Sequence, residues 1–211
     1  GGIVSCNFKI KKKLALELSK LFLEVIIGVN FDQDALKILK RKKNLRLIDA
    51  SNFTLSEILK FNSTNDNILV QSEDKKMFKR NDFKIVSKKK PSISLFNDLI
   101  FAFNICRYVK SNAIVLASNK STLGIGCGQT SRLDSCQIAI DKMKKFTRPS
   151  KDIVAASDAF FPFTDGIEKL VQSGVKAVIQ PAGSIKDKEV IKFANETGTI
   201  LVFSKTRHFR H

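Results

Sequence analysis

The residues best suited to bind or transform a ligand in this sequence lie beside predicted strands. Asn112 stands directly before an apolar segment, Arg132 follows a glycine-rich segment, and an aromatic segment covers residues 157–165. In α/β sheets, ligands bind beyond the carboxyl ends of the strands. The sequence therefore predicts a ligand site where these segments meet, at one edge of a sheet.

Three glycines, Gly124, Gly126 and Gly128, alternate with other residues before a predicted helix. They could let backbone amides approach a ligand, or they could only make a tight strand-to-helix turn. The spacing is not the dinucleotide fingerprint, and no Lys-Ser or Lys-Thr pair follows it as in a P-loop. Arg132, in the first turn of that helix, could hold an anion together with the helix amino terminus.

The aromatic segment places three phenylalanines around a proline, between Asp158 and Asp165. One interpretation is a loop whose aromatic rings fill the core and whose Asp165 caps the next helix. The other is an aromatic wall for a flat heterocycle, with a carboxylate that binds ring nitrogens. The sequence leaves both open.

Two further strand ends carry polar groups. Gly183 and Ser184, shortly before Asp187, form a turn and a helix cap or direct amides and a hydroxyl into the same cleft. Arg207 lies in a basic, aromatic tail directly after an apolar strand, so we expect the tail to be held near the sheet. There Arg207 could bind a phosphate or a carboxylate bidentately.

The net charge of +17 raises nucleic-acid binding as a hypothesis. Lysine outnumbers arginine, is spread along the chain, and forms runs without aromatic residues suited to base stacking, at 11–13, 42–43 and 88–90. We therefore expect solvated lysine-rich faces rather than a nucleic-acid site. The excess positive charge would still attract anionic substrates.

Composition limits the other classes. The four cysteines have no CxxC spacing and the two histidines stand together at the end, so we expect free thiols in a reducing cytoplasm and no metal site. No uninterrupted apolar run reaches the about 18 residues that a membrane-spanning helix needs, so a soluble protein is expected. The chain opens Gly1-Gly2-Ile3-Val4 without an initiator Met or a signal sequence, which indicates a fragment.

Helices and strands alternate along the chain. Helices are predicted over 11–20, from Asp32 or Asp34 through Leu39, from Ser92 through Cys106, from Ser131, and over 165–172 and 187–195. Strands are predicted over 25–27, 45–48, 113–117, 122–125, 153–156, 175–179 and 199–203. This alternation predicts an α/β sandwich with a mostly parallel sheet, a linker over 62–67 and a second break over 88–91.

Taken in order and spacing, the segments at the strand ends resemble 5-aminoimidazole-4-carboxamide ribonucleotide formyltransferase, part of the bifunctional purine-biosynthesis enzymes. The resemblance covers the whole chain. It is carried by Gly1-Gly2-Ile3-Val4, Ser111-Asn112-Ala113, Gly124-Ile125-Gly126 through Ser131-Arg132, Ala155-Ala156-Ser157-Asp158-Ala159-Phe160-Phe161-Pro162-Phe163, Asp165-Gly166, Gln180-Pro181 with Gly183-Ser184, and Arg207-His208-Phe209-Arg210-His211.

The resemblance implies an amino-terminally truncated, cytidine-deaminase-like three-layer α/β sandwich without catalytic zinc. Residues 1–66 would be the end of the first formyltransferase subdomain and 67–211 the second. The implied reaction transfers a formyl group from 10-formyltetrahydrofolate, the co-substrate, to 5-aminoimidazole-4-carboxamide ribonucleotide. The family also carries an inosine-monophosphate cyclohydrolase domain and works as a homodimer. A monovalent cation is a possible further cofactor that the sequence does not determine.

The resemblance also assigns residues to roles. It makes Asn112 the catalytic residue that binds the formyl oxygen or orients the amine, and it places two residues on the folate side, Asp165 and Ser184. It assigns four to the nucleotide, Arg132, Phe160, Arg207 and Phe209.

Two departures from the family qualify this picture. The family's catalytic Lys-His pair lies upstream of the segment matched by Gly1-Gly2, and neither His208 nor His211 matches it, so an inactive nucleotide- or folate-binding remnant is the alternative. Ala182 replaces a glycine of the family, and a positive φ there would be strained.

Overall fold

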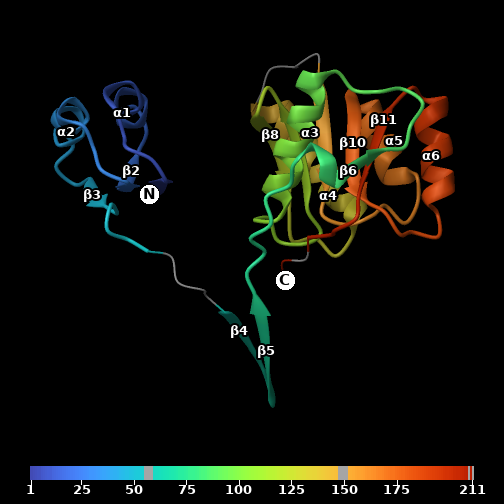
Figure 1. Ribbon diagram of the computed structural model, residues 1–211, viewed down its shortest axis with the longest axis horizontal. Coiled ribbons are helices and arrows are strands. Elements are labelled where there is room, and N and C mark those ends of the chain that lie inside the picture. The colour runs from blue at the N-terminus through green and yellow to red at the C-terminus, as the bar shows by residue number, and fades with distance from the viewer. Residues whose placement is uncertain (55–58, 147–151, 209, 211) are drawn as a thin grey trace. The chain divides into compact units, whose positions relative to one another are not determined.

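The computed structural model of the chain describes residues 1–54, 59–146, 152–208 and 210 (Figure 1). The chain divides into two compact units, residues 1–73 and 74–211. The division falls beyond the boundary expected after residue 66. The assignment of the units to two formyltransferase subdomains stays a prediction.

The first unit contains a small parallel sheet. Its three strands pair in the order β1 (Gly2–Cys6), β2 (Leu23–Gly28), β3 (Arg46–Asp49), with helices α1 (Lys12–Ser19) and α2 (Gln33–Leu39) as the crossovers. Asp32 caps α2, because its side chain accepts a hydrogen bond from the Ala35 amide at 2.6 Å. The predicted helices and strands of this unit are confirmed, and β1 adds a strand that was not predicted.

The stretch 62–67, expected as a linker, is the tip of an antiparallel hairpin. Strands β4 (Leu59–Thr64) and β5 (Asn67–Ser72) pair in register, with Phe61 opposite Val70. Asn65 and Asp66 form the turn between them, and such residues favour tight turns as well as open loops. These residues are therefore paired strands and a turn rather than an open loop. Whether the segment separates two subdomains stays a prediction.

The second unit is built on a six-stranded sheet in the order β6-β11-β10-β9-β7-β8. Its strands are β6 (Phe83–Ile85), β7 (Ile114–Ser118), β8 (Ser121–Gly126), β9 (Ile153–Ser157), β10 (Val175–Pro181) and β11 (Ile200–Ser204). Its helices are the short η1 (Arg80–Asp82), α3 (Ile93–Cys106), α4 (Arg132–Phe146), α5 (Asp165–Gln172) and α6 (Asp187–Glu196). The predicted elements of this unit are confirmed, and β6 was not predicted.

The prediction of a mostly parallel sheet is wrong. Strands β9, β10 and β11 are parallel, whereas β7 runs antiparallel to both of its neighbours and β6 runs antiparallel to β11. Asn119 and Lys120, both with positive φ, join β7 to β8 in a short turn. A turn of this length can join only antiparallel strands, since parallel strands need a long crossover.

The second unit has three layers (Figure 1). Helix α3 packs on one face of the sheet, and α4, α5 and α6 pack on the other. Successive residues of the fully buried β7 serve opposite layers, with Ile114 and Leu116 on the side of α4 and Val115 on the side of α3. The class α/β is therefore confirmed.

The glycine-rich segment brings α4 against β8. A Cβ atom on Gly124 would lie 2.0 Å from the carbonyl oxygen of Ala139, and one on Gly126 would lie 1.9 Å from that of Ser135. Both glycines thus serve the contact between helix and strand, and the positive φ of Gly128 fits the tight turn before α4. The approach of backbone amides to a ligand stays a prediction. The expected strain at Ala182 is absent, because the positive φ of that loop falls on Gly183.

Candidate functional site

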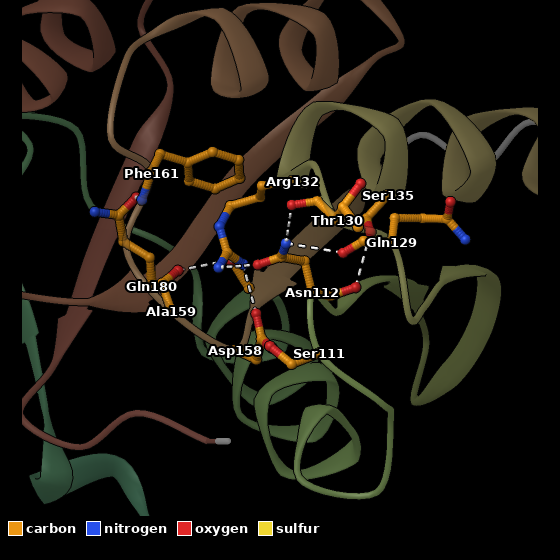
Figure 2. A network of polar contacts seen from close by, with 11 residues as sticks. Ser111, Asn112, Gln129, Thr130, Arg132, Ser135, Asp158, Ala159, Phe161 and Gln180 are labelled. Atoms are coloured by element: carbon orange, nitrogen blue, oxygen red, sulfur yellow. Dashed lines mark hydrogen bonds and ion pairs between the residues drawn. The ribbon is translucent and has the colours of Figure 1, made fainter. Parts of the chain in front are cut away.

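The antiparallel direction of β7 determines where the site lies. The amino end of β7 and the carboxyl ends of β8 and β9 occupy the same edge of the sheet. Asn112 precedes β7, Arg132 begins α4 after β8, and Asp158 follows β9. Three distant segments therefore meet at this edge (Figure 2).

The side-chain amide of Asn112 is held on both sides. Its Nδ2 donates hydrogen bonds to the backbone carbonyls of Gln129 at 2.9 Å and Thr130 at 3.0 Å. Its Oδ1 accepts from Nη2 of Arg132 at 2.7 Å, and its backbone carbonyl accepts from the Ser135 hydroxyl at 2.8 Å. The orientation of the side-chain amide is thus set by Gln129, Thr130 and Arg132, while Ser135 holds the backbone (Figure 2).

Arg132 is paired within the protein. Its Nη1 donates to Oδ1 of Asp158 and to the Ser157 hydroxyl, the latter at 2.8 Å, while its Nη2 donates to Asn112. Only 11% of its side chain is exposed. A ligand would therefore meet a guanidinium that already has acceptors, and direct binding of the nucleotide by Arg132 stays a prediction.

Asp158 is the residue at the centre of this network that the sequence analysis did not assign to a role. Its carboxylate is 1% exposed and accepts from Arg132 and, through Oδ2, from the Ser111 hydroxyl at 2.5 Å. Its backbone carbonyl accepts from the His208 amide at 2.9 Å. The signal in the sequence was a carboxylate between two small residues, Ser157 and Ala159, at the end of an apolar strand, where an unpaired charge would be costly.

A cavity of about 560 Å³ opens beside this network. Its lining includes five of the residues that the sequence analysis assigned to the site, namely Asn112, Arg132, Phe160, Asp165 and Arg207. Phe161 is buried in the core, as the first interpretation of the aromatic segment expects, and it lines the cavity together with Phe160 and the exposed Phe163. Binding of a flat heterocycle by these rings stays a prediction. Thr164, not Asp165, is the residue before α5, and the Asp165 carboxylate accepts from the amide of Gly166.

Of the two remaining predicted residues, only Ser184 can be placed, and it does not join this group. Ser184 is not among the residues that line the cavity, and its hydroxyl accepts from the amide of Lys186 at 3.1 Å. The Gly183 amide donates to Asp187, so this segment forms the turn before α6. The assignment of Ser184 to folate stays a prediction, and Phe209 lies outside the described residues.

The tail is held against the site edge, as expected from its position after β11. The Ser111 amide donates to the carbonyl of Arg210 at 2.9 Å. His208 is buried, packs against the rings of Phe78 and Phe103, and contacts the Asp74 carboxylate through Nδ1 at 2.5 Å. Its imidazole therefore belongs to the core beside the site rather than to the cavity lining.

Two of the four cysteines, Cys106 and Cys136, are buried, whereas Cys127 is exposed. In the part of the chain that the structure describes, no three histidine, cysteine, aspartate or glutamate side chains cluster as metal ligands would. Burial raises the pKa of Cys136 to about 12 and that of Cys106 well above its ordinary value, so both thiols stay protonated near neutral pH. Among the described helices, none combines the length and the apolar character needed to cross a bilayer.

The layers and the cavity define an α/β domain with a cavity beside a polar network at one edge of a mixed sheet. Residues 1–142 match the family model for the AICARFT/IMPCHase bienzyme. The chain belongs to this family.

Curated relatives extend the match to the whole chain. The bifunctional purine biosynthesis proteins PurH of Persephonella marina and Aquifex aeolicus are each 44% identical to it over all of its length. The PurH protein of Chlorobium phaeobacteroides is 41% identical, again over the whole chain. The chain spans 41% of the length of the first two relatives and 40% of the third.

Proposed function

We propose that the chain supplies formyltransferase residues to a bifunctional enzyme of purine biosynthesis. The reaction transfers the formyl group of 10-formyltetrahydrofolate to the 5-amino group of 5-aminoimidazole-4-carboxamide ribonucleotide. The observation that carries the proposal is the cavity that gathers Asn112, Arg132, Phe160, Asp165 and Arg207 from four separate segments. The names of the relatives support the same role.

The lining suits the chemistry of these substrates. Phe160 offers an aromatic face to a flat ring, and Arg207 offers a positive charge to a phosphate. The amine of this ribonucleotide is a poor nucleophile because its lone pair is delocalised, so the transfer needs a base for its proton and a group that stabilises the developing oxyanion. Asn112 belongs to the polar network and also lines the cavity, where it could orient such an amine.

The catalytic base is not assigned to a residue of the cavity lining. Among the described residues that line the cavity, none is a lysine or a histidine. We assign the base to the family's Lys-His pair, outside residues 1–211, in a cytoplasmic homodimer of cytidine-deaminase-like formyltransferase domains. The same observation favours a second candidate, a remnant that binds nucleotide or folate without turnover.

The test uses the full-length gene product and follows the formation of tetrahydrofolate by absorbance. We expect Arg207→Ala to raise the KM for the ribonucleotide about 10- to 100-fold, because the variant loses a charge-assisted hydrogen bond to the phosphate. Lys192→Ala is the control, since that side chain is 77% exposed and lies on α6 in an ion pair with Glu196. Binding of the ribonucleotide without any formyl transfer would support the remnant, and neither binding nor transfer would refute both candidates.

A further inference from the structure

The carboxylate of Asp158 lies behind the cavity rather than in its lining. It is 1% exposed, and its two oxygens accept from Nη1 of Arg132 and from the hydroxyl of Ser111. A ligand in the cavity would contact Asn112 and Arg132 before it reached this group. Any effect of Asp158 on the chemistry would therefore pass through Arg132, which lines the cavity, or through Ser111, which directly precedes Asn112.

The chemistry of its neighbours determines which way the Asn112 amide points. Arginine has only donors, whereas the backbone carbonyls of Gln129 and Thr130 can only accept. The oxygen of the amide must therefore face Arg132, and both hydrogens of its nitrogen are used by the two carbonyls. What remains for a ligand is the second lone pair of Oδ1, which is an acceptor.

We infer that Asp158 is a positioning residue for formyl transfer: it holds Arg132 so that Asn112 presents its oxygen, rather than its nitrogen, to the amine of the substrate. This inference rests on the proposed function. It selects one of the two roles that the family resemblance left open for Asn112, because an amide whose hydrogens are both donated to the backbone orients an amine and does not bind the formyl oxygen.

Loss of the charge on Asp158 should release this arrangement. In Asp158→Asn the guanidinium loses its only charged acceptor among the described contacts, and the new amide can turn a donor toward it. Arg132 and then the Asn112 amide would leave their present positions. A displacement on the order of 1 Å at a reacting group can lower a rate about 100-fold.

The experiment compares two buried aspartates in the full-length protein. Asp98 is the control, since it is 4% exposed and its carboxylate accepts from the amides of Asn119 and Lys120 at 2.8 Å, away from the cavity lining. We expect Asp158→Asn to lower kcat, measured per folded molecule, about 10- to 100-fold while the KM for the ribonucleotide changes less than about 3-fold. Asp98→Asn should lower the thermal stability and leave kcat unchanged.

A double-mutant cycle then tests whether Asp158 acts through Asn112. In single-turnover experiments, the double variant should be no slower than Asn112→Ala alone. Equal effects of Asp158→Asn in both backgrounds, or an unchanged kcat in the single variant, would overturn the inference. If Asn112→Ala has no measurable rate, the inference is tested by Asp158→Asn alone, in which kcat should fall while KM stays nearly constant. A wild-type protein without formyl transfer refutes the proposed function instead.

Discussion

Two hairpins of nearly equal strand length have opposite surroundings in this chain. In β7–β8 every residue of β7 is buried, with α3 on one face and α4 on the other. In β4–β5 every residue of both strands is exposed, including Phe61 and Val70. The same antiparallel pairing thus occurs with and without a core.

The comparison shows how much the stability of a hairpin depends on the helices that cover its two faces. An isolated two-stranded hairpin is marginally stable in water, because backbone pairing alone barely exceeds the entropy lost on ordering. Burial of the apolar side chains of β7 on both faces supplies the difference in the second unit. The layers around β7 also bring Asn112, Arg132 and Asp158 together, so the buried hairpin is the one beside the site.

The largest expected effect is at the centre of the buried hairpin. Leu116→Ala removes a side chain with no exposed surface and leaves a cavity between β7 and α4, which should cost about 2–5 kcal/mol. Hydrogen exchange of β7 peptides in the full-length protein measures this as faster local opening. Protection of β7 equal to that of the wild type would show that burial does not stabilise this hairpin.

A smaller effect is expected where the hairpin contacts α4. In Gly126→Ala the new methyl group would lie 1.9 Å from the carbonyl oxygen of Ser135, so the helix or the strand must shift. Such overpacking costs about 1–3 kcal/mol and should also lower formyl transfer, because α4 begins with Arg132. Ser121→Ala, at an exposed position of β8, is the matched variant for unfolding and activity assays. If both variants unfold alike, the close approach is not required.

The smallest effect is expected in the exposed hairpin. Phe61→Ala removes a side chain that is 64% exposed, so it should change the free energy of unfolding by less than about 0.5 kcal/mol. Rapid hydrogen exchange of β4–β5 peptides in wild-type protein would agree with this. Slow exchange there, together with a large loss of stability in Phe61→Ala, would break the comparison and show that another surface covers this hairpin.

Much of the fold could be predicted because the periodicity of apolar residues is local information. Helix α5 has the predicted bounds, Asp165–Gln172, and Ser92 caps α3, where its hydroxyl accepts from the Leu95 amide. The short edge strand β6 was missed, since three residues are too few to show the alternation of apolar and polar side chains that indicates a strand. The direction of β7 was also missed, because strand pairing depends on residues far apart in the sequence.

The sequence by itself determined the α/β class, several of the segments that line the cavity and the family resemblance that the family match bears out. The types and order of residues suffice for these properties. Only the tertiary structure decided that Gly124 and Gly126 serve the packing of α4, that Ser184 lies apart from the cavity lining, and that Asp158 holds Arg132. These properties depend on which backbone and charged groups contact one another at this edge of the sheet. The direction of the strands determines those contacts, and short-range sequence patterns do not specify strand direction.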